Sequence, residues 1–140
     1  MVILDTNVLS EALRPRPHPA VLAWFSARMY NDLYITTITQ AEILSGVERA
    51  PDGKRKRALR ESVDAILAEF DGRVLPFDEE AAQAFPYVRA GRARRGRPIS
   101  AFDALIASIA HSRGAPVATR DTSGFEDCGV VVIDPWTYRL

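Results

Sequence analysis

Short, unbroken apolar runs recur along this chain, and longer stretches with helical spacing separate them. The runs lie within residues 1–5, 33–36, 74–77, 117–119 and 130–133. None of them alternates apolar with polar residues, which is typical of strands that are covered on both faces. Strands that alternate with helices along the chain form parallel sheets, because each crossover helix returns the chain to the same end of the sheet. The pattern therefore predicts a parallel α/β sandwich.

The stretches between these runs carry apolar residues three and four positions apart, as amphipathic helices do. The predicted helices cover residues 7–13, 19–29, 39–50, 59–70, 79–94 and 100–113. Pro15 follows the first helix, Pro19 begins the second and Gly114 stops the last. Pro86 lies inside the fifth helix, which we expect it to kink or divide.

Length and composition indicate one domain outside the membrane. A chain of 140 residues can bury most of its apolar surface in one unit, so we expect residues 1–140 to form a single domain. The apolar runs are far shorter than a bilayer is thick, so no transmembrane helix is expected. The amino terminus lacks the basic region, long apolar stretch and cleavage site of a signal peptide. We therefore expect a cytoplasmic protein.

Cysteine and histidine are too few to build a zinc site. Cys128 is the only cysteine, which excludes an internal disulfide, and the two histidines, His18 and His111, lie far apart along the chain. A metal site in this chain would therefore depend on carboxylates.

Four acidic residues lie where a predicted strand ends or a predicted helix begins. They are Asp5, Glu42, Asp103 and Asp121. In open parallel sheets, ligands bind beyond the carboxyl ends of the strands at the switch point, which is where Asp5 and Asp121 would lie. Carboxylate oxygens suit Mg²⁺ or Mn²⁺, and such ions support in-line attack on a phosphodiester. The four acids are therefore candidate metal ligands.

Three of these acids also have a purely structural explanation. Residues 39–42 and 100–103 both place an acid three residues after a hydroxyl, which is the spacing of a capping box. Asp121 begins an Asp-Thr-Ser-Gly stretch that suits a turn. Asp5 has no such explanation, since an acid at the end of a buried strand must be solvated, hydrogen-bonded or bound to a metal.

Basic residues gather in two stretches although the net charge is zero. Residues 54–57 with Arg60 form one stretch, and residues 89–97 form the other. Either stretch alone is explained by a solvated helix face. Beside an acidic metal site, contacts with nucleic-acid phosphates become the better explanation. The candidates for such contacts are Arg89, Arg92, Arg94, Arg95 and Arg97.

Four motifs in order along the chain resemble those of the PIN-domain ribonucleases. They are Val2-Ile3-Leu4-Asp5-Thr6-Asn7, Thr39-Gln40-Ala41-Glu42-Ile43-Leu44-Ser45-Gly46, Ala101-Phe102-Asp103-Ala104-Leu105-Ile106-Ala107 and Ala118-Thr119-Arg120-Asp121. Within this family the chain is most similar to VapC-type toxins of bacterial toxin-antitoxin pairs. The FitB-like branch is indicated by Leu75-Pro76-Phe77-Asp78-Glu79, Thr119-Arg120-Asp121-Thr122 and Asp134-Pro135-Trp136.

The resemblance implies a three-layer sandwich around a five-stranded parallel sheet. It also implies a Mg²⁺ or Mn²⁺ site, lined by Asp5, Glu42, Asp103 and Asp121. The hydroxyls of Thr6 and Thr119 would orient these acids, and Gly46 would let its helix pack closely. Many members carry an Asn-x-x-Asp-Phe pattern at the fourth acid. Here Thr119 replaces that context and Phe125 comes four residues after Asp121, so Glu126 or Asp127 could take its place through water.

The function implied by the resemblance is hydrolysis of RNA to a 3′-hydroxyl and a 5′-phosphate by metal-activated water. A cognate antitoxin would silence the chain by inserting a basic side chain into the acidic pocket, and the toxin would form a homodimer. The alternative is a non-catalytic module that binds nucleic acid or antitoxin. A receiver-like domain is disfavoured because no lysine follows the late strands, and a haloacid-dehalogenase-like phosphatase because Asp5 lacks a second Asp two residues on.

Overall fold

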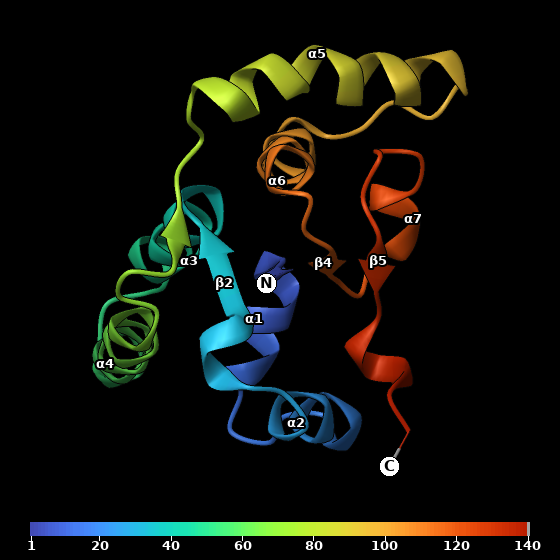
Figure 1. The fold of residues 1–140 in the computed structure, drawn as a ribbon. Coiled ribbons are helices and arrows are strands. Elements are labelled where there is room, and N and C mark those ends of the chain that lie inside the picture. The colour runs from blue at the N-terminus through green and yellow to red at the C-terminus, as the bar shows by residue number, and fades with distance from the viewer. Residues whose placement is uncertain (140) are drawn as a thin grey trace.

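A five-stranded parallel sheet forms the centre of the molecule (Figure 1). In this computed structural model, which describes residues 1–139, the strands are β1 (Val2–Leu4), β2 (Leu33–Thr36), β3 (Val74–Leu75), β4 (Val117–Ala118) and β5 (Val132–Ile133). Their order across the sheet is β3-β2-β1-β4-β5, and every neighbouring pair is parallel. The predicted parallel α/β fold is therefore confirmed.

Helices follow each of the first four strands. They are α1 (Thr6–Ala12), α2 (Pro19–Ser26), α3 (Thr37–Arg49), α4 (Lys54–Glu69), α5 (Glu79–Arg94), α6 (Ala101–Arg113) and α7 (Thr122–Phe125), with two 3-10 turns, η1 (Tyr30–Asp32) and η2 (Pro135–Thr137). The helix α4 begins before the predicted residue 59. Its start was missed because the first turn is basic and carries no apolar stripe. The helix α7 was not predicted, since its four residues read as a turn. Pro86 does not divide α5, which continues through it.

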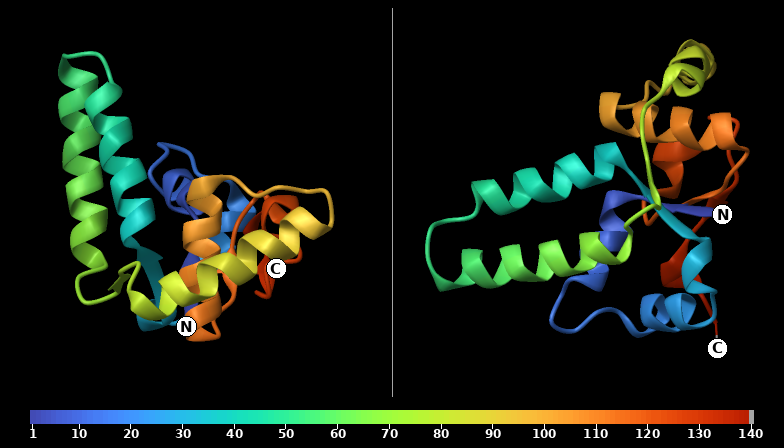
Figure 2. Two further views of the ribbon diagram at one scale, coloured as in Figure 1. Left: turned by 90° about the horizontal axis from the view of Figure 1, so that it is seen from above. Right: turned by 60° about the vertical axis from the view of Figure 1, so that its left-hand side comes forward.

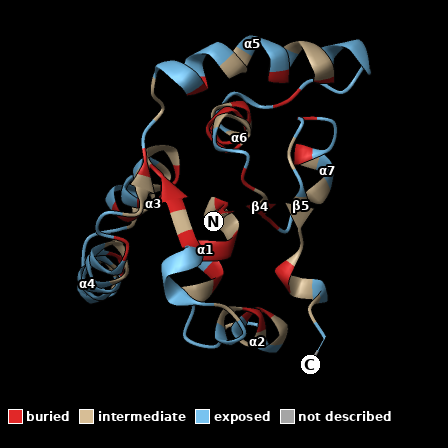
Figure 3. Cartoon of the chain, in the orientation of Figure 1, coloured by how far each residue is buried: buried red, intermediate tan, exposed pale blue. Residues whose placement is uncertain are grey.

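Two apolar cores, one on each face of the sheet, make this a three-layer structure (Figure 3). Side chains alternate along each strand, so neighbours face opposite cores. Ile3 and Val117 pack with α5 and α6, whereas Leu4 and Ala118 pack with residues of α1 to α4. The implied three-layer sandwich is confirmed.

The helices α3 and α4 form a long antiparallel pair that projects from the body of the molecule (Figure 2). The body covers little of α4, in which Val63 is the one fully buried residue. This projection gives the molecule a recess between the helix pair and α1. Within residues 1–139, every helix is too short or too polar to span a bilayer.

The strand order determines where a site can form. From β1 the chain goes outward to β2 and β3 on one side, and β4 and β5 occupy the other side. The switch point therefore lies between β1 and β4, whose carboxyl ends lead directly into Asp5 and Thr119. The backbone amide of Asp5 donates a hydrogen bond of 2.8 Å to the carbonyl of Ala118, so the two ends are held together.

Candidate active site

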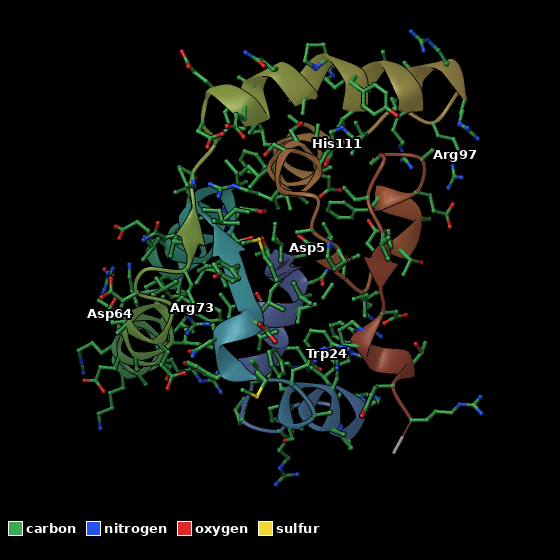
Figure 4. All side chains as sticks on the ribbon, in the orientation of Figure 1. Asp5, Trp24, Asp64, Arg73, Arg97 and His111 are labelled. Carbon is green, nitrogen blue, oxygen red and sulfur yellow. The ribbon has the colours of Figure 1, made fainter. Side chains whose placement is uncertain are left out.

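Asp5 lies near the middle of the molecule, at the carboxyl end of β1 (Figure 4). It caps α1 and is only 5% exposed. Its Oδ1 accepts a hydrogen bond from the backbone amide of Thr6 at 2.8 Å, and its Oδ2 accepts from the Thr119 hydroxyl at 2.8 Å and from Asn7 Nδ2 at 3.1 Å. These three donors fix the orientation of the carboxylate.

The pKa of Asp5 is raised from 3.8 to about 6, and burial is the largest cause. The charges of Asp103 and Glu42 raise this pKa further, whereas the hydrogen bonds from Thr119 and Thr6 lower it. Asp5 is therefore a carboxylate whose ionised form is held by hydrogen bonds but disfavoured by its surroundings.

Thr119 and Asn7 connect the ends of β1 and β4. The Thr119 hydroxyl donates to Asp5 and accepts hydrogen bonds from Asn7 Nδ2 at 3.2 Å and from the backbone amide of Asp121 at 3.0 Å. Asn7 Oδ1 accepts from the backbone amide of Arg120 at 3.1 Å. The resemblance indicated Thr119, but no local pattern predicts the bond between Asn7 and Arg120, because 113 residues separate the partners.

Glu42 approaches the cleft from α3, in the second turn of the helix. The Thr6 hydroxyl donates to Glu42 Oε1 at 2.7 Å and lies 3.0 Å from the Thr39 hydroxyl. The expected capping box at residues 39–42 is wrong. The residue that caps α3 is Thr36, whose hydroxyl accepts from the Thr39 amide at 3.1 Å. Capping therefore does not explain Glu42, which leaves its contact with Thr6 as the reason for its position.

Asp103 approaches from the first turn of α6. Ser100 caps this helix and accepts a hydrogen bond from the Asp103 amide at 3.3 Å, as the capping interpretation predicted. Burial raises the pKa of the half-buried Asp103 carboxyl, the Ser100 contact lowers it, and the negative charge of Asp121 raises it. The capping role and a place beside another acid thus coexist in this residue.

Asp121 is exposed and caps the short helix α7. Its Oδ1 accepts from the Gly124 amide and from the Ser123 hydroxyl, both at 3.2 Å, so Asp121 caps a helix where a turn was expected. Glu126 and Asp127, the suggested substitutes through water, do not line the acidic cleft described below. Glu126 pairs with Arg97 at 3.0 Å and Asp127 with Arg95 at 3.3 Å.

The four predicted acids line one cleft of about 540 Å³, which we call the acidic cleft. Its walls are formed by Asp5, Thr6, Asn7, Ser10, Glu11, Arg14, Glu42, Asp103, Arg120, Asp121 and Trp136. The donor set suits a hard divalent cation, since carboxylates predominate and the hydroxyls orient them. Among residues 1–139, however, no three acidic or imidazole side chains stand close enough together to form a ready-made metal-binding group. The acids therefore share a cleft without forming a preformed cage.

The basic end of α5 differs from its prediction. The interpretation of Arg92 as a phosphate contact is wrong: its side chain is buried and donates to the carbonyls of Ser123 at 2.7 Å and Glu126 at 2.9 Å. Arg95 and Arg97 are exposed but pair with acids near α7. Arg89 lies over the Phe85 ring at 5.7 Å, and Arg94 is exposed. None of these five arginines is among the described residues that line the acidic cleft, and Figure 4 places Arg97 at the periphery.

A second hollow of about 800 Å³ adjoins the acidic cleft between α1, α3 and α4, and we call it the apolar groove. Its apolar lining includes Leu13, Ile43, Val47, Leu59, Val63 and Phe102, and it shares Thr6, Ser10, Arg14 and Glu42 with the acidic cleft. Gly46 lies on its wall. The expectation that Gly46 allows close packing is wrong, because a Cβ there would meet no atom within 4 Å.

Comparison with known proteins agrees with this architecture. A family model described as PIN domain matches residues 2–130. Toxin FitB of Neisseria gonorrhoeae is 42% identical over 137 residues, which cover 97% of this chain and 99% of that protein. VapC ribonuclease Y4jK of Sinorhizobium fredii is also 42% identical over 137 residues, covering 97% of this chain and 98% of that protein.

A solved structure of FitAB bound to an IR36 DNA fragment superposes with a TM-score of 0.94 at 41% identity, over 100% of this chain and 99% of that one. Both the sequence match and the fold thus extend over nearly the whole chain. The chain belongs to the PIN-domain family, and its relatives at this level of identity include toxin FitB and a VapC ribonuclease.

Proposed function

We propose that this chain is a metal-dependent ribonuclease and the toxin of a type II toxin-antitoxin pair. The observation that carries the proposal is the meeting of Asp5, Glu42, Asp103 and Asp121, from four separate segments, in one cleft at the switch point of the sheet. A relative of 42% identity bears the name VapC ribonuclease, which supports RNA as the substrate.

The four carboxylates are the residues that would hold Mg²⁺ or Mn²⁺. Such an ion would supply charge stabilisation at the phosphate and a more acidic water as nucleophile. Binding would also draw the proton from Asp5, since its pKa is near 6 and metal ligands must be deprotonated.

Hydrogen bonds from neighbouring residues of the chain orient the candidate metal ligands. Thr119, Asn7 and the Thr6 amide fix both oxygens of Asp5, and the Thr6 hydroxyl holds Glu42 from the other side. Asp103 and Asp121 are more open to solvent than Asp5, so they face the side from which a phosphodiester approaches. No histidine takes part, because neither His18 nor His111 lines the acidic cleft within the described residues.

Cleavage of a labelled structured RNA tests the proposal. The purified chain, free of partner, is expected to cut with Mg²⁺ or Mn²⁺, to stop with EDTA, and to leave 5′-phosphate ends. The Asp5→Asn and Asp103→Asn chains are expected to be inactive. Equal cleavage by all three chains would indicate a contaminating nuclease, and no cleavage under any condition would favour the alternative of a non-catalytic binding module.

A cognate antitoxin is the partner that the apolar groove favours. An apolar segment laid in this groove would end at Ser10, Arg14 and Glu42, which also line the acidic cleft. A basic side chain at that point would pair with the acids and silence the enzyme. Co-expression with the product of a small neighbouring open reading frame is expected to give a stable, inactive complex, which Leu59→Lys in the groove should weaken.

The remaining parts of the proposal concern assembly and location. We take residues 1–140 as a single PIN domain that forms a homodimer and acts in the cytoplasm. Light scattering on the purified chain tests the dimer, since a monomer mass at micromolar concentration would contradict it.

A further inference from the structure

One arginine at the rim of the acidic cleft has no acidic partner. Arg120 lies between Thr119 and Asp121, and its backbone is held by Asn7. Its guanidinium lies over the ring of Trp136, 5.2 Å from the centroid. Among residues 1–139 this guanidinium makes no hydrogen bond or ion pair, and the residue is exposed. Its N–H donors are therefore free to bind a ligand.

The Trp136 ring under the Arg120 guanidinium is itself held in place by the fold. Trp136 lies in η2, its backbone amide donates to Asp134 Oδ1 at 2.9 Å, and it packs against the core that the sheet shares with α1 to α4. The half-buried ring therefore keeps its place while lining the cleft.

The charge of the cleft explains why such an arginine is needed. Five carboxylates line it, from Asp5, Glu11, Glu42, Asp103 and Asp121, and they repel a phosphodiester. Arg14 and Arg120 are the two basic residues in the lining that the structure describes. Arg14 already pairs with Glu11 at 3.2 Å, which leaves Arg120 as the cation available to the substrate.

We propose that Arg120 and Trp136 form a nucleotide subsite of the enzyme. This inference rests on the proposed ribonuclease function and adds the residues that hold the strand. The Arg120 guanidinium binds a backbone phosphate next to the acids, and a base of the same strand stacks on the part of the Trp136 ring that lines the cleft beside this guanidinium. Aromatic faces and guanidinium planes are the usual partners of unpaired bases, and stacking of this kind tolerates any sequence.

The test measures binding of a labelled single-stranded RNA oligonucleotide by fluorescence anisotropy over a series of KCl concentrations. The full chain carries Asp103→Asn, so that the RNA stays intact in Mg²⁺. In this background, Arg120→Gln is expected to weaken binding roughly 3- to 10-fold and to flatten the salt dependence of log affinity by about 0.7, the value for one phosphate contact on a single strand. Arg113→Gln removes one charge at the opposite end of α6 and should change neither quantity.

The tryptophan has its own pair of variants. Trp136→Leu is expected to weaken binding roughly 5- to 100-fold with an unchanged salt dependence, because stacking carries no charge. Trp136→Phe keeps an aromatic face and should stay within about threefold of the parent. Phe also disturbs the packing of the core less than Leu does. Melting temperatures of both variants therefore show whether a loss of RNA affinity comes from lost stacking or from a destabilised fold.

Parental RNA affinity in both Arg120→Gln and Trp136→Leu would overturn the subsite, while metal-dependent cleavage by the wild-type chain would still support the ribonuclease. Absence of RNA binding by the parent would overturn the subsite, and the absence of cleavage by wild type would overturn the ribonuclease itself. If these variants kept the parental RNA affinity but no longer formed a complex with the neighbouring gene product, Arg120 and Trp136 would be contacts for a protein partner. That result would also overturn the proposal.

Discussion

In the acidic cleft, the charge of Asp103 raises the pKa of Asp5, and the charge of Asp121 raises the pKa of Asp103. At the basic end of α5, by contrast, Arg92 is buried against two carbonyls, and Arg95 and Arg97 each pair with an acid. Both regions gather one sign of charge, the first from separate segments of the chain and the second from residues 89–97. In the first region Glu11 pairs with Arg14, but the four candidate metal ligands form no ion pair within residues 1–139.

The difference shows that only those charged side chains that the fold has not already bound to an opposite charge or to backbone carbonyls are available to bind a ligand. Repulsion within the acidic cleft destabilises the fold, and such strain persists where a ligand relieves it. The arginines of α5 instead satisfy carbonyls and acids around α7 and stabilise the fold. If this contrast is right, substitutions in the cleft alter activity, and those at α5 alter stability or little at all.

The largest effect is expected from removing one carboxylate of the acidic cleft. Asp103→Asn should lower the rate of RNA cleavage in Mg²⁺ on the order of 100- to 1000-fold, because it removes one carboxylate from the donor set. Folding should survive, since the cap at Ser100 uses the backbone amide of residue 103. The matched change Arg95→Gln, at the basic end of α5, should leave the rate within about twofold. A comparable loss of rate in both variants would contradict the contrast.

The second prediction concerns pH. Because burial raises the pKa of Asp5 from 3.8 to about 6, the unfolded chain loses this proton first as pH rises. Asp5 therefore lowers the free energy of unfolding progressively between about pH 3.8 and pH 6, by roughly 3 kcal/mol in all, and fully above that range. Urea unfolding of wild type and Asp5→Asn across this range should show a difference that grows with pH; parallel curves would disprove it.

Cation binding should reverse this destabilisation. At neutral pH, Mg²⁺ at 100 times its dissociation constant is expected to stabilise wild type by about 2.7 kcal/mol. The Asp5→Asn chain should gain much less in the same titration of melting temperature.

Arg92 gives the third prediction, on stability alone. Arg92→Gln should lower the free energy of unfolding by about 2 kcal/mol, because the shorter side chain leaves the carbonyls of Ser123 and Glu126 without their donor. Exposed Arg94→Gln should change it by less than about 0.5 kcal/mol. Equal stabilities in denaturant titrations would show that Arg92 has no structural role.

The fourth prediction separates positioning from chemistry. Thr119→Val loses the hydrogen bond to Asp5 Oδ2, so the pKa of Asp5 should rise further and the pH profile of cleavage should move to higher pH. We expect about a tenfold loss of rate at neutral pH, the energy of one charge-assisted hydrogen bond. Thr119→Ser keeps the hydroxyl and should restore the profile, whereas a loss of rate without a shift in profile would contradict this role.

The smallest effect is expected from Arg94→Gln. It should leave both RNA affinity and its salt dependence nearly unchanged, since Arg94 does not line the acidic cleft in the described structure. A flattening of about 0.7 in the salt dependence would instead return the RNA contact to α5.

Much of this fold could be predicted from local patterns. The apolar runs, the cap at Ser100 and the stop at Gly114, which adopts a φ of 61°, all depend on residues within one element. The cap of α3 was misplaced by three residues because Thr36 and Thr39 both suit a helix start, and the choice depends on where β2 ends. The acids themselves were found through their motifs and their places at element ends.

The sequence by itself determined which residues form strands and helices, and which carboxylates the chain carries at their ends. Tertiary structure decided which charges remain free. Arg92 donates to the carbonyl of a residue 31 positions away, and Asn7 Oδ1 accepts from the backbone amide of a residue 113 positions away. Contacts at such separations follow from the strand order β3-β2-β1-β4-β5, which sets β1 beside β4. Local propensity cannot predict that β1 lies beside β4, because this order is set only when helices cover both faces of the sheet.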